Sequence, residues 1–183
     1  MSSGADRSPV VMTIRTPSST KDLDIYGAGA LPWSRAEEAL QAGVLKMSTA
    51  CFLSTVRPDG RPHSAAVGVA YRDGDVFFTS GPGTRKSRNL AANPACTIAL
   101  KLEGVDLVLE GEAHRVTDVP TLEAVAAVYR DGGWPAQVEG DALTAPYSAQ
   151  SAGPPPWHLY RVDVATAFGV GTAEPYGASR WRF

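Results

Sequence analysis

The feature that most constrains this chain is a series of three apolar, β-branched runs separated by turn sequences. The first run, Cys51–Val56, is followed by Arg57-Pro58-Asp59-Gly60, and the second, Arg61–Tyr71, is followed by Asp73-Gly74 and then the third, Asp75–Ser80. Proline, aspartate and glycine are turn residues, and Asp-Gly is typical of a two-residue hairpin loop. Because connections this short join antiparallel neighbours, the runs predict a meander of three strands.

The remaining periodic segments do not alternate as strand-helix-strand units. Apolar residues have helical spacing from residue 34 to about residue 46, where Ser34 and Glu37 have the spacing of a capping box. Further helices are predicted at 84–92 and from about 118, and further strands at 95–102, 105–116 and 157–169. This order predicts an α+β domain built around a six-stranded antiparallel barrel with flanking helices.

The chain divides into an N-terminal stretch and one domain. Residues 1–30 hold scattered Ser, Thr, Pro and Gly without periodicity, which predicts a mobile arm. Residues 31–183 are predicted to form a single domain, in which 131–156 is a long loop with the character of a functional lid. Three aromatic residues in or beside this loop either form a lid over a substrate or pack the loop down: Trp134, Tyr147 and Trp157.

Composition argues against several classes of function. The formal net charge is −2 and the isoelectric point is about 5.9, whereas a broad nucleic-acid surface requires a basic face. No apolar run approaches the length of a transmembrane helix, and the N-terminus lacks the apolar core of a signal peptide. Cys51 and Cys96 lie in strand-like runs and are expected to be buried, reduced thiols. We therefore expect a cytoplasmic protein with no nucleic-acid or membrane partner.

A glycine-rich connection between a strand and a helix carries a cluster of basic residues. Thr79-Ser80-Gly81-Pro82-Gly83 leads into the helix at 84–92, which begins with Arg85, Lys86 and Arg88 in one turn. A helix N-terminus offers free backbone N–H groups and a partial positive charge, and nearby basic side chains strengthen its attraction for an anion. The connection is therefore a candidate phosphate site; alternatively, the basic residues form a solvated helix face.

Three segments resemble, in this order, the FMN-binding split β-barrel family that includes pyridoxamine-phosphate oxidase. They are residues 54–63, residues 76–80 and the basic helix with its following Asn93-Pro94, and the resemblance covers about 34 to 170. It implies a split β-barrel that forms a homodimer with two cofactors in clefts between the subunits. The ending Arg180-Trp181-Arg182-Phe183 lacks the longer Arg- and Pro-bearing segment of pyridoxamine-phosphate oxidases proper, and it looks more like actinobacterial flavin and deazaflavin reductases.

The resemblance also implies which residues bind the cofactor. These are His63, Ser64 and Val67 beside the ring system, Thr79, Ser80, Arg85 and Lys86 at the phosphate, and Asn89, which matches an Asn common in the deazaflavin-using branch. In a regular strand, His63 and Ser64 point to opposite faces, so only one of them can face the cleft. Alternatively, His63 is an exposed histidine at a strand edge.

The function implied by the resemblance is that of an oxidoreductase. It would use a flavin-type cofactor, FMN or the deazaflavin coenzyme F420, for hydride transfer to a small organic substrate. Such cofactors carry out the redox chemistry themselves, which agrees with a sequence that has no Ser-His-Asp, metal-ligand or paired-carboxylate motif. Vitamin B6 oxidation is not expected. Two alternatives stay open: a non-catalytic protein that binds or sequesters a flavin, a deazaflavin or haem, and a family member without a cofactor.

Overall fold

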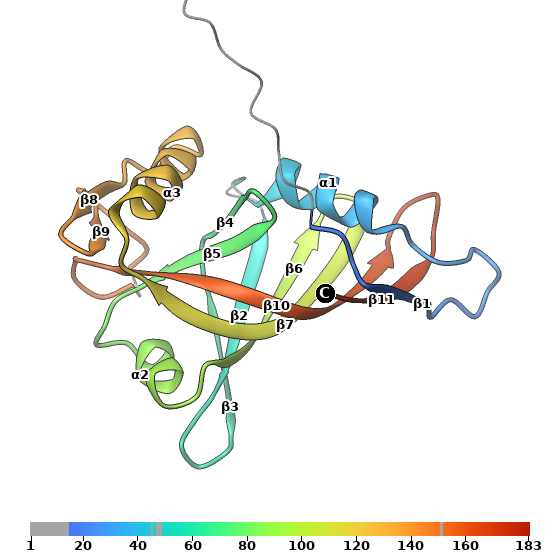
Figure 1. The fold of residues 1–183 in the computed structure, drawn as a ribbon, viewed down its shortest axis with the longest axis horizontal. Coiled ribbons are helices and arrows are strands. Elements are labelled where there is room, and N and C mark those ends of the chain that lie inside the picture. The colour runs from blue at the N-terminus through green and yellow to red at the C-terminus, as the bar shows by residue number, and fades with distance from the viewer. Residues whose placement is uncertain (1–14, 45, 47–48, 151) are drawn as a thin grey trace, which may run out of the picture.

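The computed structural model describes residues 15–44, 46, 49–150 and 152–183, which form three helices and eleven strands (Figure 1). The helices are α1 (Trp33–Gly43), α2 (Arg85–Ala92) and α3 (Val119–Asp131). The strands are β1 (Ser19–Asp22), β2 (Ala50–Val56), β3 (Pro62–Ala66), β4 (Val69–Arg72), β5 (Asp75–Ser80), β6 (Ala95–Leu102), β7 (Val105–Val116), β8 (Gln137–Glu139), β9 (Ala142–Thr144), β10 (His158–Gly171) and β11 (Ala178–Arg182). None of the described helices has the length and hydrophobicity needed to cross a membrane.

Nine strands form one curved antiparallel sheet. Its hydrogen-bonded order is β1-β11-β10-β7-β6-β2-β3, and β5 joins the same sheet by pairing with β10 and β4. The 14-residue β10 bonds to β5, β7 and β11, and a bulge between Val164 and Thr166 shifts its register against β7. The sheet curls around a common core, with α1 and α2 at opposite ends and α3 outside it near β8 and β9 (Figure 1). The predicted α+β fold around an antiparallel barrel is confirmed.

The number of strands is larger than the predicted six. The run predicted as one strand over Arg61–Tyr71 divides at Val67-Gly68 into β3, which pairs with β2, and β4, which pairs with β5. Asp73 (φ 52°) and Gly74 (φ 86°) form the expected hairpin between β4 and β5. β1 and β11 add two strands at one edge of the sheet, in segments whose sequences carry no strand signal.

The stretch predicted as an arm over residues 1–30 contains a strand. Ser19–Asp22 forms β1 and pairs with β11 in an antiparallel register that places Ser19 opposite Arg182. The Leu23 backbone N–H extends this ladder by donating to the Ala178 carbonyl at 3.0 Å. β1 is exposed along its whole length, so backbone hydrogen bonds to β11 hold it in the sheet and its sequence needs no hydrophobic pattern. Residues 1–14 lie outside the described residues.

Two hydrophobic cores share the strands β5 and β10. The larger core fills the barrel, and the smaller one lies under α3 around Leu122. Successive residues of a strand point to opposite faces. Phe78 and Tyr160 therefore stack inside the barrel with 5.2 Å between ring centroids. Their neighbours Phe77 and Leu159 face α3 instead, so the two strands hold the cores together.

The capping box predicted at the start of α1 does not form. The helix begins at Trp33 after Pro32 and has no side-chain cap. Glu37 is only 3% exposed and accepts a hydrogen bond from the Tyr71 hydroxyl at 2.5 Å. Its position one turn before the buried Leu40 places it on the face of α1 that packs on the barrel. A tertiary partner thus replaces the local one.

The connection between α3 and β10 is packed down by its aromatic residues. β8 and β9 form a small hairpin within it, which corrects the prediction of a loop over 131–156. Trp157 is buried, and its ring centroid lies 5.7 Å from that of Trp134. The Trp134 indole N–H donates to the Tyr147 carbonyl at 2.7 Å. The structure therefore favours the packing alternative over the lid for these side chains.

Candidate functional site

The candidate site is built around the first turn of α2. The Thr84 hydroxyl caps this helix by accepting from the Ser87 backbone N–H at 3.4 Å. The buried Ser80 hydroxyl lies 2.9 Å from the Thr84 hydroxyl and 2.7 Å from the Ser87 hydroxyl. These contacts join the end of β5 to the start of α2, and they confirm the strand-turn-helix unit predicted for this part of the chain.

A second set of hydrogen bonds ties α2 to β2 and β3. The Asn89 side-chain amide donates to the Thr55 hydroxyl at 2.9 Å, and that hydroxyl donates to the His63 carbonyl at 3.4 Å. Both Asn89 and Thr55 are almost completely buried. The register places His63 directly opposite Thr55, so the imidazole lies on the face of the sheet that α2 covers.

Lys86 is buried without a hydrogen-bond or ion-pair partner in the described chain, which is rare for a lysine. Its side chain is only 7% exposed, and among the described residues it forms no hydrogen bond or ion pair. Burial lowers its pKa, with no described acid acting to raise it. A lysine side chain packed in this way gives up part of the hydration of its charge, which is costly unless an anion lies beside it. Lys86 therefore favours the binding of an anion at this position.

Positive charge from other elements adds to that of Lys86. Burial lowers the pKa of His63, and the charges of Arg57, Lys86 and Arg85 lower it further. Arg57 follows β2, whereas Arg85 is exposed on the first turn of α2, so two distant segments of sequence supply the charge. Their combined field attracts an anion and keeps the His63 ring neutral near neutral pH.

Two buried polar atoms of the site have no hydrogen-bond partner in the described chain. They are Nδ1 of His63 and Oδ1 of Asn89. Buried polar atoms in folded proteins are nearly always hydrogen-bonded. The site thus combines an ammonium group suited to a phosphate with a ring nitrogen and an amide oxygen suited to the polar edge of a heterocycle. These residues fit a planar, phosphorylated cofactor.

The structure brings together five of the eight residues that the resemblance assigned to a cofactor, namely His63, Ser80, Arg85, Lys86 and Asn89. Ser64 is exposed on the opposite face of β3, with 3.4 Å between its hydroxyl oxygen and that of Ser54. Thr79 lies two residues after Phe77, which packs in the core under α3, so its side chain also points toward α3. Val67 follows β3 and packs against the barrel core. Contact between any of the eight residues and a cofactor stays a prediction.

Two further residues belong to the site beyond the eight that the resemblance assigned. Thr55 links α2 to β3, and His158 lies opposite Ser80 in the β5–β10 register. Burial lowers the pKa of His158, and the charge of Arg115 adds to this effect. Strand alternation places Thr55 on the same face as the buried Leu53, so its inward position could have been read from the sequence. No local signal places His158, because the pairing of β10 with β5 is a long-range property.

The surroundings of His63 predict a loss of stability in mild acid. Its pKa in the folded chain lies below the ordinary value of 6.5, so between these values the unfolded chain binds a proton that the folded chain does not. The free energy of unfolding should therefore fall as the pH drops through 6.5 and level off below the folded pKa. Melting temperatures of the ligand-free protein from about pH 7.5 to about pH 5 measure this, and His63→Asn should make the curve less steep, with the remaining slope due to His158.

The matched control for this prediction is His114→Asn. His114 is half exposed, with Nε2 3.5 Å from Glu112 and 3.8 Å from Asp163, so this variant removes no desolvated imidazole. It should leave the acid-induced loss of stability in place. An identical pH dependence in the wild-type and His63→Asn proteins would show that His63 titrates as it does in water.

Comparison with known proteins shows which family has this arrangement. The sequence model described as pyridoxamine 5'-phosphate oxidase matches residues 36–171, which is most of the chain. The chain belongs to this family. The match includes the barrel strands β2 to β7, α2 and every residue of the candidate site, and it confirms the resemblance inferred from the sequence. No curated protein matches the sequence.

Solved structures share the fold of this pyridoxamine 5'-phosphate oxidase family member. An FMN-binding, pyridoxamine 5'-phosphate oxidase-related protein from Nostoc punctiforme is 17% identical, with 83% of this chain and 91% of that chain covered and a TM-score of 0.55. A haem-binding protein from Mycobacterium smegmatis is 19% identical, with 81% and 59% covered and a TM-score of 0.56. General stress protein 26 from Bacillus anthracis is 17% identical, with 74% and 91% covered and a TM-score of 0.51. At these identities, the likeness concerns the fold alone.

Proposed function

We propose that this family member binds a flavin-type cofactor, FMN or coenzyme F420, and acts as an oxidoreductase. The observation that carries the proposal is Lys86, a lysine whose side chain is largely buried without a described partner on the first turn of α2. Lys86 and Arg85 would hold the phosphate, and Ser80 lies at the same end of the helix. The FMN-binding protein from N. punctiforme, which has the same fold, supports this choice of ligand.

The chain would bind and orient the cofactor rather than supply its chemistry. A bound flavin or deazaflavin accepts and donates hydride through its own ring system. His63 Nδ1 and Asn89 Oδ1 are available to polar atoms of that ring, and the neutral imidazole adds no charge beside it. We propose that the hydride goes to a small organic substrate. A cytoplasmic location is consistent with the buried free thiols of Cys51 and Cys96.

The two cofactors differ in how much negative charge they present. F420 carries an acidic polyglutamate tail beyond its phosphate, so it requires a longer basic track than FMN. Arg61 is already paired with Asp59 at 2.7 Å, and Arg88 donates to the Gly83 carbonyl at 2.8 Å. Arg57, whose charge acts on His63, is the residue best placed to extend the track. This short track supports FMN, whereas the match at Asn89 supports F420.

A fluorescence titration with FMN, FAD and F420 side by side tests the proposal. We expect saturable binding of FMN or F420, and weaker binding of FAD, because its second phosphate and adenosine have no assigned partner in the site. The cofactor that binds more tightly identifies the redox partner. If none of the three binds, the assignment of a flavin-type cofactor is wrong.

We also propose that the functional unit is a homodimer, because an apolar row crosses the outer face of the sheet. Strand register aligns five residues on β3, β2, β6, β7 and β10: Ala66, Phe52, Ala99, Val108 and Phe168. Phe52 is 48% exposed, and none of the five belongs to either buried core. A second copy of the chain would cover this row. Because the row ends at β3, whose other face carries His63, residues of that copy would also line one side of the cofactor site.

Replacement of Phe52 by Asp is expected to convert the dimer to a monomer. An unpaired charge buried in an interface costs about 3–5 kcal/mol, which weakens association by more than about a hundredfold. Light scattering after size-exclusion chromatography measures the change, and cofactor affinity should fall with it. Tyr26→Asp is the control, because Tyr26 is 91% exposed and lies outside the row. A Phe52→Asp protein that remains dimeric would contradict this interface.

A non-catalytic binding protein is the second candidate function. The structural likeness to the haem-binding protein from M. smegmatis supports it, because the same fold serves binding there. Turnover separates the two functions. An oxidoreductase should transfer electrons from its reduced cofactor to a quinone, an enone or oxygen faster than the free cofactor does. Tight binding with no acceleration toward any of these acceptors would support sequestration instead.

A further inference from the structure

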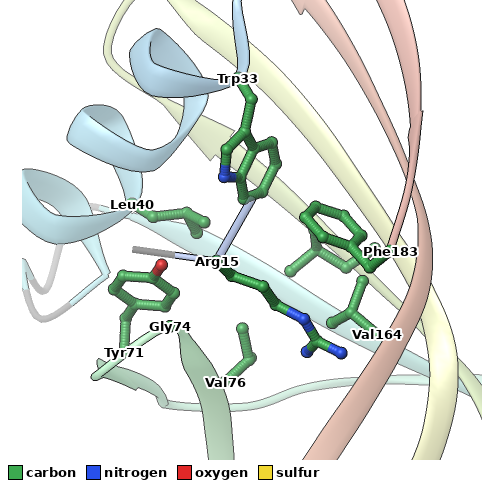
Figure 2. Close-up of a pocket in the computed structure, with 9 residues that line it drawn as sticks. Arg15, Trp33, Leu40, Tyr71, Gly74, Val76, Val164 and Phe183 are labelled. Atoms are coloured by element: carbon green, nitrogen blue, oxygen red, sulfur yellow. The ribbon is translucent and has the colours of Figure 1, made fainter. Parts of the chain in front are cut away.

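The mouth of the barrel beneath α1 is lined by aromatic side chains from three parts of the chain (Figure 2). Trp33 comes from α1, Tyr71 comes from β4, and Phe183 follows β11. The rings of Trp33 and Phe183 meet edge to face, with 4.9 Å between their centroids. Since α1 and α2 pack at opposite ends of the barrel, this mouth is separate from the candidate cofactor site.

Arg15 lies across this mouth. Its guanidinium carbon is 5.2 Å from the centroid of the Phe183 ring, and its Nη1 is 3.9 Å from Oδ1 of Asp75. Figure 2 shows the side chain extended through the space that the lining residues surround. The cavity that remains has a volume of about 10 Å³, which is roughly the room for one water molecule. Arg15 therefore occupies most of the space in the mouth.

The mouth has the chemistry of a cation site. Aromatic faces attract cations, and cages of aromatic rings bind alkylammonium groups. Two carboxylates stand beside the rings: Asp75 pairs with Arg15, and the buried Glu37 fixes the Tyr71 ring by accepting from its hydroxyl at 2.5 Å. Burial raises the pKa of Asp75, and the charges of Arg161 and Arg15 oppose this effect. A cation in the mouth therefore stabilises the Asp75 carboxylate.

We infer that the barrel mouth is a binding site for a small organic cation, an alkylguanidinium or alkylammonium ion, which Arg15 occupies from within the chain. Arg15 itself has this chemistry, because it carries a planar cation on an apolar stem. Arg15 belongs to no helix or strand, and its side chain is 32% exposed. An external cation binds by displacing Arg15, which competes at the high effective concentration of a tethered group. The site is independent of the cofactor proposal.

Chemical rescue of Arg15→Ala in the full chain tests this inference. The variant is titrated with n-propylguanidinium and, separately, with its neutral isostere n-propylurea, and binding heat and melting temperature are recorded. We expect saturable binding of propylguanidinium that raises the melting temperature by about 3–6 °C at about ten times its Kd. Propylurea should bind at least about tenfold more weakly, because it lacks the charge. Wild-type protein should respond little, because Arg15 fills its site.

The double variant Arg15→Ala, Asp75→Asn supplies the control. It keeps the enlarged mouth but removes the carboxylate, so its response to propylguanidinium should fall to the level of propylurea. The inference is wrong if the two compounds act equally on Arg15→Ala, if the double variant keeps the full response, or if no heat of binding is measured. Should Arg15→Ala fail to fold, Arg15→Gln, which keeps an apolar stem and lacks the charge, undergoes the same titrations.

Discussion

Replacement of Lys86 by Met is expected to weaken cofactor binding by about tenfold to a hundredfold without reducing the stability of the cofactor-free protein. A hydrogen bond to a charged group contributes about 1.5–3 kcal/mol, which corresponds to this loss of affinity. Lys86 is 7% exposed and has no partner among the described side chains, so its charge is a cost to the ligand-free fold. Met keeps an unbranched apolar stem and removes the charge.

The opposite effects on binding and stability make this variant informative. A residue that only supports the fold would lose stability on replacement, and a residue on a solvated helix face would change neither quantity. Lys21→Met is the matched control, because it makes the same chemical change at an exposed position on β1. Fluorescence titration gives the dissociation constants, and thermal unfolding without cofactor gives the stability. Unchanged affinity for both FMN and F420 in Lys86→Met would remove this residue from the cofactor site.

Local signals in the sequence were sufficient for the unit that holds the site. The glycines after Ser80 are a short-range feature, and α2 begins at Arg85, one residue after the predicted start at 84. The Asp73-Gly74 hairpin is equally local, because both residues adopt positive φ angles. Lys86 could therefore be selected from its residue type and its place on the first turn of a helix.

Properties that depend on distant partners could not be predicted in the same way. β1 and β11 are short segments that become strands only by pairing with distant strands, β11 with β10 and β1 with β11. Glu37 has the spacing of a local cap, but its hydrogen-bond partner Tyr71 lies on β4. Thr79 and Ser80 are adjacent, yet only the position of β5 between two cores decides that Ser80 faces α2 while Thr79 faces α3. The orientation of site residues therefore required the three-dimensional structure.

Replacement of Trp181 by Ala is expected to reduce the free energy of unfolding by about 3–5 kcal/mol, a large part of the roughly 5–15 kcal/mol of a typical domain. Trp181 is fully buried, and its ring meets that of Trp33 edge to face with 5.2 Å between centroids. A side chain at Gly169 would come within 2.5 Å of the Trp181 ring, so β10 approaches this indole as closely as glycine allows. Removal of the indole therefore leaves a cavity between α1, β10 and β11.

Urea denaturation is the appropriate measurement for Trp181→Ala, because guanidinium is a cation of the kind expected to bind at the barrel mouth. Tyr176→Ala is the control, since Tyr176 is an aromatic residue that is 55% exposed just before β11, and its loss should cost less than about 1 kcal/mol. An equally small loss for Trp181→Ala would contradict the placement of β11 in the core.

Cofactor affinity of the folded Trp181→Ala protein should be unchanged, because Trp181 lies at the α1 end of the barrel and Lys86 lies on α2 at the opposite end. A loss of stability without a loss of binding would thus show that the two ends of the barrel act separately.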